Sequence, residues 1–151
     1  MRGTERPSDP RRMHAEANKL VVRRFVDEYQ TAANEQSFAE LLHPEVVDRS
    51  RPPGIAEGAE GVRQQFEAFR AAFPDFHAVI HDQIAEGDKV VTRKVFHGTH
   101  RGELMGIAPT GREVQIEVID IVRIEGGQIV EHWNVVDRLA LLQQLGALDA
   151  A

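Results

Sequence analysis

The strongest constraint in this chain is the alternation of side chains between Arg112 and Asp137, where two apolar runs flank a glycine turn. Residues of one parity in a β-strand share one face of the sheet. In the first run, that parity carries β-branched aliphatic residues and a single acid: Val114, Ile116, Val118, Asp120, Val122 and Ile124. The pattern predicts a β-hairpin with one buried face, and it places a carboxylate on that face.

Asp120 therefore needs an explanation. Burying an ionised carboxylate costs free energy unless the group is paired or hydrogen-bonded. Asp120 is thus either satisfied by polar partners in the core or is a working carboxylate in an apolar pocket. We predict the second role, a general base in a proton-transfer reaction, because apolar surroundings are a common setting for catalytic carboxylates.

The turn decides which residues face Asp120. Glu125, Gly126 and Gly127 suit a three-residue loop with a left-handed glycine at Gly127, a register that places His132 opposite Asp120. A two-residue loop would shift the pairing by one residue and bring Trp133 to that position instead.

In the three-residue register, Asn134 lies one diagonal step from Asp120. We predict that Asp120, His132 and Asn134 form a catalytic site. His132 would be an orienting partner or proton shuttle, or a core histidine satisfied by Asp120. Asn134 would donate a hydrogen bond to the substrate or to a developing oxyanion. Trp133 falls on the opposite face, where packing or a dimer interface is its expected role.

Composition narrows the class of protein. The chain has 151 residues, enough for one domain with a real core, and its net charge of −6 argues against a nucleic-acid partner. It contains no cysteine, so thiolate chemistry is excluded, and it has no apolar run long enough to cross a bilayer. We expect a soluble, cytoplasmic protein with no membrane partner. A disordered lead over residues 1–13, one domain over 14–147 and a tail over 148–151 are expected.

Helical and strand patterns occupy separate parts of the chain. Apolar periodicity predicts helices from about Met13 to Ala32, from Ser37 to Leu42, from about Ala59 to Phe73 and from Arg138 to Leu145. The first helix could start as early as Ser8, with Pro10 in its first turn, and Ser37 with Glu40 forms a capping box for the second. Strand patterns cover Phe76 to Ala85, Lys89 to His100 and the two arms of the hairpin, whereas residues 44–58 read as a loop with a possible short strand at Val46 and Val47. Helices followed by a meander of strands predict an α+β domain with helices packed on one sheet face.

Two further segments are expected to contact a ligand. The helix around Phe66 and Phe69 presents its apolar stripe to the core. The Gly- and Pro-rich segment 101–111 carries Leu104 and Met105, and an apolar loop of this kind should cover a pocket mouth as a rim or lid. The predicted substrate-binding residues are His100, Phe66, Phe69, Leu104, Met105 and Val118. His97 and His100 lack the short spacing of metal ligands, so we expect no metal.

Short motifs along the chain resemble those of the SnoaL-like polyketide cyclase family, which belongs to the NTF2-like superfamily. The resemblance runs from about Asn18 to Gly146. The residues that carry it are His43-Pro44, Phe73-Pro74-Asp75, Gly87-Asp88, Gly98-Thr99-His100 with Gly102, Pro109-Thr110-Gly111, Glu131-His132-Trp133, Asp137 and Gln144-Leu145-Gly146.

The resemblance implies a cone-shaped α+β barrel in which N-terminal helices close a curved, mainly antiparallel sheet over a deep apolar pocket. It also implies a homodimer through the other sheet face, and chemistry without a cofactor or metal. In the cyclases, a pocket aspartate removes a proton from a polyketide ester, and the enolate closes a ring by aldol addition. The family's acid follows the tryptophan, where this chain has Asn134, and a histidine of the family corresponds to Asp120.

These observations together predict a polyketide cyclase-like lyase or isomerase acting on a small apolar ligand that contains a carbonyl group. The reaction would be aldol cyclisation, isomerisation or dehydration, begun by proton abstraction at an acidic α-carbon. The alternative is a non-catalytic NTF2-like domain that binds its ligand in the same pocket. An open, carboxylate-lined pocket favours the enzyme, and a filled core favours a structural role.

Overall fold

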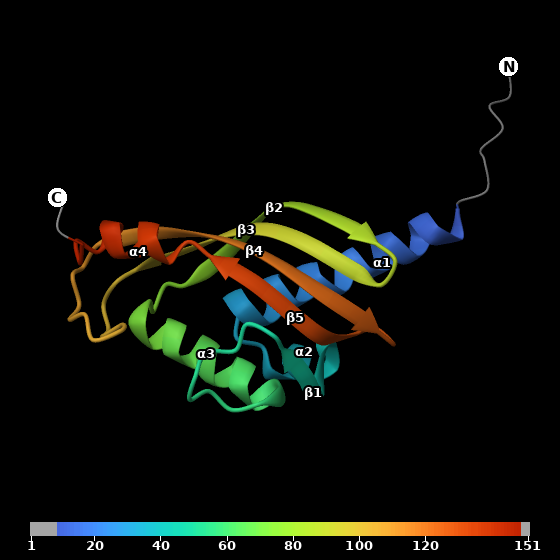
Figure 1. Ribbon diagram of the computed structural model, residues 1–151, viewed down its shortest axis with the longest axis horizontal. Helices are drawn as coiled ribbons and strands as arrows, with labels where there is room; N and C mark the ends of the chain where they lie inside the picture. The colour runs from blue at the N-terminus through green and yellow to red at the C-terminus, as the bar shows by residue number, and fades with distance from the viewer. Residues whose placement is uncertain (1–8, 149–151) are drawn as a thin grey trace, which may run out of the picture.

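A single five-stranded sheet, with α1, α2 and α3 on one side and α4 beyond the end of β5, makes up the computed structural model, which describes residues 9–148 (Figure 1). The strands lie in the order β1-β5-β4-β3-β2, and all neighbouring pairs are antiparallel except β1 with β5. The helices are α1 (Pro10–Arg24), the π-helix η1 (Phe25–Thr31), α2 (Glu35–Leu41), α3 (Gly58–Ala72) and α4 (Arg138–Gln144). The strands are β1 (Leu42–Asp48), β2 (His77–Glu86), β3 (Lys89–Thr99), β4 (Glu113–Glu125) and β5 (Gln128–Val136). The predicted α+β class is confirmed.

Buried and more exposed side chains alternate along the whole of β4. Every second residue from Val114 to Ile124, including Asp120, is buried, while most of the intervening side chains are exposed. The buried face is covered by α1, η1 and α3, and we call it the inner face of the sheet. An aspartate thus sits in the middle of an aliphatic row, as the sequence pattern predicted.

The predicted register of the β4–β5 hairpin is wrong. Glu125 pairs with Gln128 across a two-residue turn, in which Gly126 and Gly127 both have positive φ angles of 57° and 76°. Such a turn needs glycine-like freedom at both central positions. A bulge then adds one residue to β5.

The bulge restores the parity that the shorter turn would have reversed. Asp120 therefore faces Asn134 directly, and His132 faces Val122. Trp133 pairs with Ile121 on the outer face of the sheet, as its parity predicted. All three predicted catalytic residues lie on the inner face, but the pairs that they form across the two strands differ from the prediction.

The N-terminal helix begins at Pro10, which agrees with the earlier of the two predicted starts, although Asp9 and not Ser8 is the cap. Asp9 caps α1 by accepting a hydrogen bond from the Arg11 amide at 3.0 Å, and Pro10 occupies the first turn, where its missing N–H is not needed. Residues 10–13 are therefore helical instead of part of an irregular lead, while the rest of the expected lead and the expected tail from residue 149 lie outside the described residues. The helix continues into η1, which turns Gln30 inward.

The loop expected over residues 44–58 begins with a strand. The helix α2 begins at Glu35, two residues before the predicted start, because Asn34 caps it, and it ends at Leu41. The chain then enters β1, which runs parallel to β5 and places Asp48 beside His132. Pairing with β5 and burial of Leu42 and Val46 stabilise this edge strand, which is short and contains Pro44.

Aromatic residues fill much of the space between helices and sheet. Tyr29 packs on Phe38 with ring centroids 4.4 Å apart, and Phe66 contacts Tyr29, Phe69, Phe76 and Phe96. None of the helices within residues 9–148 is long and apolar enough to cross a membrane.

Candidate active site

A cavity of about 300 Å³ separates the inner face of the sheet from the helices. Most of its lining is aliphatic or aromatic, with contributions from α1, η1, α3, α4 and all strands except β2. Its wall reaches Met105, which is 53% exposed, so the cavity extends to the surface beside the 101–111 segment. The polar residues of the lining are Gln30, Asp48, Ser50, Gln65, Lys94, Asp120, His132, Asn134 and Arg138.

The cavity brings together nearly all of the predicted site residues. Asp120, His132 and Asn134 line it, as do the predicted substrate-binding residues Phe66, Phe69, Leu104, Met105 and Val118. The sequence predicted that these residues lie around one pocket, and all eight line this cavity.

His100 is the exception, since it does not line the cavity. Its side chain is fully buried beyond the end of β3, where Nδ1 lies 3.0 Å from the Thr110 hydroxyl and 3.2 Å from the Thr110 amide. The strand ends at Thr99, and the chain folds back so that Gly111 donates to the His100 carbonyl at 2.8 Å. His100 thus holds the base of the 101–111 segment and lies outside the cavity lining, and its role in substrate binding stays a prediction.

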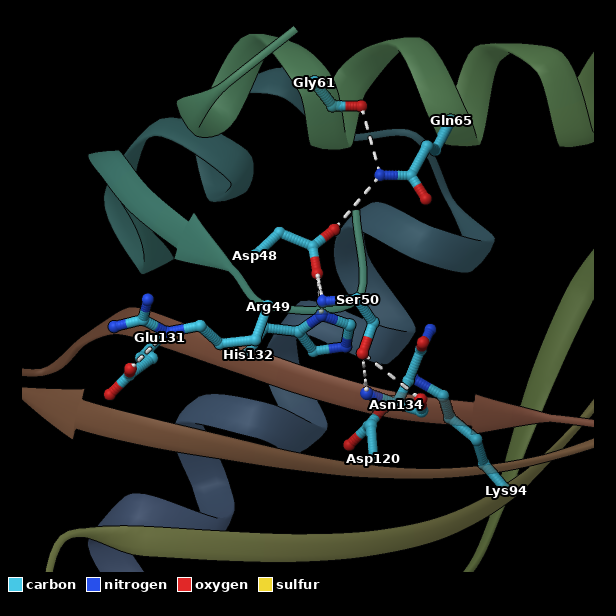
Figure 2. Close-up of polar contacts among 10 residues, drawn as sticks. All are labelled: Asp48, Arg49, Ser50, Gly61, Gln65, Lys94, Asp120, Glu131, His132 and Asn134. Carbon is cyan, nitrogen blue, oxygen red and sulfur yellow. Dashed lines mark hydrogen bonds and ion pairs between the residues drawn. The ribbon is translucent and has the colours of Figure 1, made fainter. Parts of the chain in front are cut away.

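Asp120 has a partner that the sequence reasoning did not identify. The Lys94 ammonium of β3 lies 2.5 Å from Asp120 Oδ2, and both side chains are almost completely buried (Figure 2). Lys94 also donates to Gln30 Oε1 at 3.2 Å. The other carboxylate oxygen, Asp120 Oδ1, is buried and has no hydrogen-bond partner within residues 9–148. One oxygen of Asp120 is therefore ion-paired, and the other is left for a ligand.

A second acidic group, Asp48, holds His132. Asp48 Oδ1 lies 3.1 Å from His132 Nδ1 and accepts the Ser50 amide at 3.0 Å, while Oδ2 accepts the Gln65 amide at 3.2 Å (Figure 2). Burial alone would raise the pKa of Asp48, but the hydrogen bond and charge of His132, with the bonds from Gln65 and Ser50, lower it overall. An ionised Asp48 can only accept, so His132 Nδ1 carries a proton and Nε2 is the nitrogen available for proton transfer.

Asn134 is fixed through its main chain. The Ser50 hydroxyl accepts the Asn134 amide at 2.9 Å and donates to the Asn134 carbonyl at 3.2 Å. Because these bonds use backbone atoms, the Asn134 carboxamide stays free to contact a ligand beside Asp120 (Figure 2).

Lys94 and Asp48 are the residues that sequence reasoning missed. Lys94 shares its strand parity with Val90, Thr92 and Phe96, which are all buried, so the alternation in β3 did contain a signal for an inward lysine. Asp48 offered no such signal, because its position depends on the parallel pairing of β1 with a strand more than eighty residues away.

The remaining histidines do not assemble with this site. His97 lies on the outer face of β3, where its ring stacks on His77 with centroids 4.8 Å apart. Over the described part of the chain, no group of three or more His, Cys, Asp or Glu side chains is arranged to hold a metal ion.

A curved sheet closed by helices over one apolar, acid-containing cavity defines a small-molecule pocket domain of the α+β class. The SnoaL-like polyketide cyclase model matches residues 20–145, and the chain belongs to this family. The fold is therefore NTF2-like, as the motif resemblance implied.

Characterised relatives agree with this assignment. The chain is 31% identical over 134 residues to aklanonic acid methyl ester cyclase from Streptomyces peucetius, covering 83% of this chain and 88% of that one. It is 31% identical over 109 residues to nogalonic acid methyl ester cyclase from Streptomyces nogalater, covering 71% and 81%. Among solved structures, TsrD from Streptomyces laurentii superposes with a TM-score of 0.80 at 32% identity, covering 88% of this chain and 97% of TsrD.

Proposed function

We propose that this protein abstracts a proton from a carbonyl compound without a cofactor, with Asp120 as the general base. The supporting observation is the free Asp120 Oδ1 atom, which belongs to a side chain 5% exposed in the wall of an apolar cavity. A base held in this way is oriented by its second oxygen and shielded from bulk water. Such a base contributes roughly 10²–10⁴-fold to the rate.

The substrate class follows from the relatives, whose names identify methyl esters of polyketide acids. We infer that this chain closes a ring in a related ester by aldol addition. Asp120 takes the α-proton, the enolate carbon bonds to a ketone carbon of the same molecule, and the resulting alkoxide takes up a proton. Isomerisation or dehydration would begin with the same proton abstraction.

The other polar groups have complementary roles in this proposal. His132, oriented by Asp48, exchanges the second proton through Nε2. The Asn134 side-chain carboxamide donates to a substrate oxygen next to Asp120. The apolar walls, which include Phe66, Phe69, Leu104, Met105 and Val118, hold the carbon skeleton in the reacting conformation.

One observation favours the alternative of a binding domain without turnover. Asp120 forms an ion pair with Lys94, and an ionic partner disfavours uptake of a proton by a carboxylate. In a non-catalytic protein, the same pair would recognise a polar group of the ligand, and Asn134 at the position of the family's acid would mark the loss of chemistry.

Cyclisation assays separate the two functions. Aklanonic acid methyl ester would be incubated with the protein and with Asp120→Asn, and ring closure followed by liquid chromatography. We expect turnover by the unchanged protein and a loss of roughly 10²–10⁴-fold in the variant, with ligand affinity retained. Binding of the ester without turnover by either protein would establish the binding domain, and full activity in the variant would remove Asp120 from the mechanism.

We also propose a homodimer built through the outer sheet face. Exposed apolar side chains gather there on neighbouring strands, with Val135 75% and Ile119 49% exposed beside Trp133. Patches of this kind on a sheet face are commonly covered by a second copy. Sedimentation at micromolar concentration should show a dimer, and Val135→Glu should convert it to a monomer. A monomer in both proteins would contradict the proposal.

A further inference from the structure

The buried ammonium of Lys94 is the strongest unexplained feature of the site. Its side chain is 3% exposed on the inner face of β3, between Thr92 and Phe96. Removing an ammonium group from water costs several kcal/mol unless its partners compensate. A lysine is therefore an unusual residue for this position, and its partners indicate what it does.

Lys94 and Asp120 satisfy each other only in part. The ammonium has three N–H donors, and two acceptors contact it within residues 9–148: Asp120 Oδ2 at 2.5 Å and Gln30 Oε1 at 3.2 Å. Asp120 likewise has one oxygen without a partner. Both residues line the cavity, so a donor of Lys94 and an acceptor of Asp120 are left for the same ligand.

We propose that Lys94 is a catalytic residue that holds the enolate oxygen formed when Asp120 takes the α-proton. The proposal rests on the proton abstraction proposed above. In the step, the substrate C–H bond breaks and an O–H bond forms at Asp120 Oδ1. The bonding electron pair moves onto the carbonyl oxygen, so Asp120 becomes neutral and the enolate oxygen becomes negative.

The ammonium thus exchanges one anionic partner for another. Before proton transfer it neutralises the Asp120 carboxylate, and afterwards it neutralises the enolate, so the net charge in the cavity does not change. This exchange answers the objection that an ion pair weakens a base, because the cation that stabilises the carboxylate also stabilises the product of its reaction. Fixed charges that meet developing charge in a dry site contribute strongly to catalysis.

The rival explanation is a structural ion pair in which Lys94 only anchors Asp120. A structural lysine would have no preference for an anionic ligand. The two explanations therefore differ in ligand binding, which is measurable without turnover.

The test uses Asp120→Asn, whose neutral side chain mimics protonated Asp120 and leaves the ammonium without its anion. The probe is 4-nitrophenol, a planar phenol whose phenolate alone absorbs strongly in visible light. We expect the variant to bind the phenolate form roughly 10–100-fold more tightly than the unchanged protein does, the range expected of one charge-assisted hydrogen bond. The gain should disappear in Asp120→Asn/Lys94→Met.

Lys89 provides the matched control, because it lies on the same strand but on the outer face, over the ring of Trp133. Asp120→Asn/Lys89→Met loses the same charge and should keep the gain in phenolate binding. Equal binding of the phenolate by Asp120→Asn and Asp120→Asn/Lys94→Met would overturn the proposal.

If Asp120→Asn does not fold, Lys94→Met in the otherwise unchanged protein gives the second test. The fraction of bound probe that is phenolate should fall relative to the unchanged protein, and an unchanged fraction would overturn the proposal. These outcomes are distinct from failure of the proposed function, which is measured by ring closure and not by probe binding.

Discussion

Two aspartates occupy the same cavity with opposite degrees of satisfaction. Asp48 uses both carboxylate oxygens, accepting from His132, Ser50 and Gln65. Asp120 uses one oxygen for Lys94, and its other oxygen has no hydrogen-bond partner among residues 9–148. A buried acceptor without a partner is unfavourable for stability. The comparison indicates that Asp48 positions a neighbour, whereas Asp120 is kept ready for a ligand (Figure 2).

The two aspartates also lie on different strands. Asp120 lies in the middle of β4, inside the sheet, while Asp48 ends the edge strand β1. The proposed base is thus on a central strand of the sheet, and Asp48 connects the sheet to α3 through Gln65. Variants at each aspartate test whether the two carboxylates have different roles.

The largest expected effect is on stability, from removing half of the buried ion pair. Asp120→Leu should lower the free energy of unfolding by about 3–5 kcal/mol, because the Lys94 ammonium loses its anion in an apolar cavity. Asp120→Leu/Lys94→Met should recover most of that loss, since no buried charge remains. Urea unfolding of both variants measures the difference, and equal stability of the two would mean that the pair is not coupled.

Asp48→Asn should have a smaller effect, and on turnover. The variant keeps the shape of the side chain but weakens the orientation of His132, so we expect roughly a tenfold loss of kcat, about 1.4 kcal/mol in the barrier. Steady-state kinetics with the methyl ester would show it. A loss as large as that of Asp120→Asn would erase the distinction between the two aspartates.

We expect the contribution of Asp48 to the free energy of unfolding to be lost at acid pH. Its pKa is lowered in the folded protein, so this contribution is complete above the ordinary aspartate value of 3.8. It is lost as the pH falls below 3.8 and through the folded-state pKa. Unfolding curves between pH 6 and pH 2 should therefore converge for the unchanged protein and Asp48→Asn at the acid end. A constant difference across that range would contradict the assignment.

The smallest expected effect concerns the 101–111 segment. Leu104 and Met105 line the cavity, and an isolated bridge joins Leu104 to Ile107 across the tip, where Met105 has a positive φ of 49°. We predict that ligand slows amide hydrogen exchange here more than in β4. Exchange as slow as that of the sheet with and without ligand would show that the segment does not act as a lid.

Much of the fold could be predicted from the sequence, because alternation in β4 and apolar periodicity in α3 are local signals. The parity of Asp120, His132 and Asn134 was also predictable. Their register was not, since a two-residue turn followed by a bulge gives the same parity as a three-residue turn. A bulge leaves little trace in sequence.

The partners of the site residues depended on long-range structure. Asp48 meets His132 only after β1 pairs with β5, and Gln30 meets Lys94 only after η1 packs on β3. The inward position of Lys94 could have been predicted from the buried residues that alternate with it. Its ion pair with Asp120 needed the arrangement of β3 and β4, in which Lys94 faces Val118 and Asp120 faces Thr92.

The central claim, that Asp120 takes the α-proton, is tested most directly by solvent-deuterium incorporation at the α-carbon of aklanonic acid methyl ester. The unchanged protein and Asp48→Asn should both incorporate deuterium faster than the uncatalysed reaction. Asp120→Asn should incorporate it only at the uncatalysed rate, while still binding the ester. Incorporation by Asp120→Asn at the rate of the unchanged protein would contradict the claim.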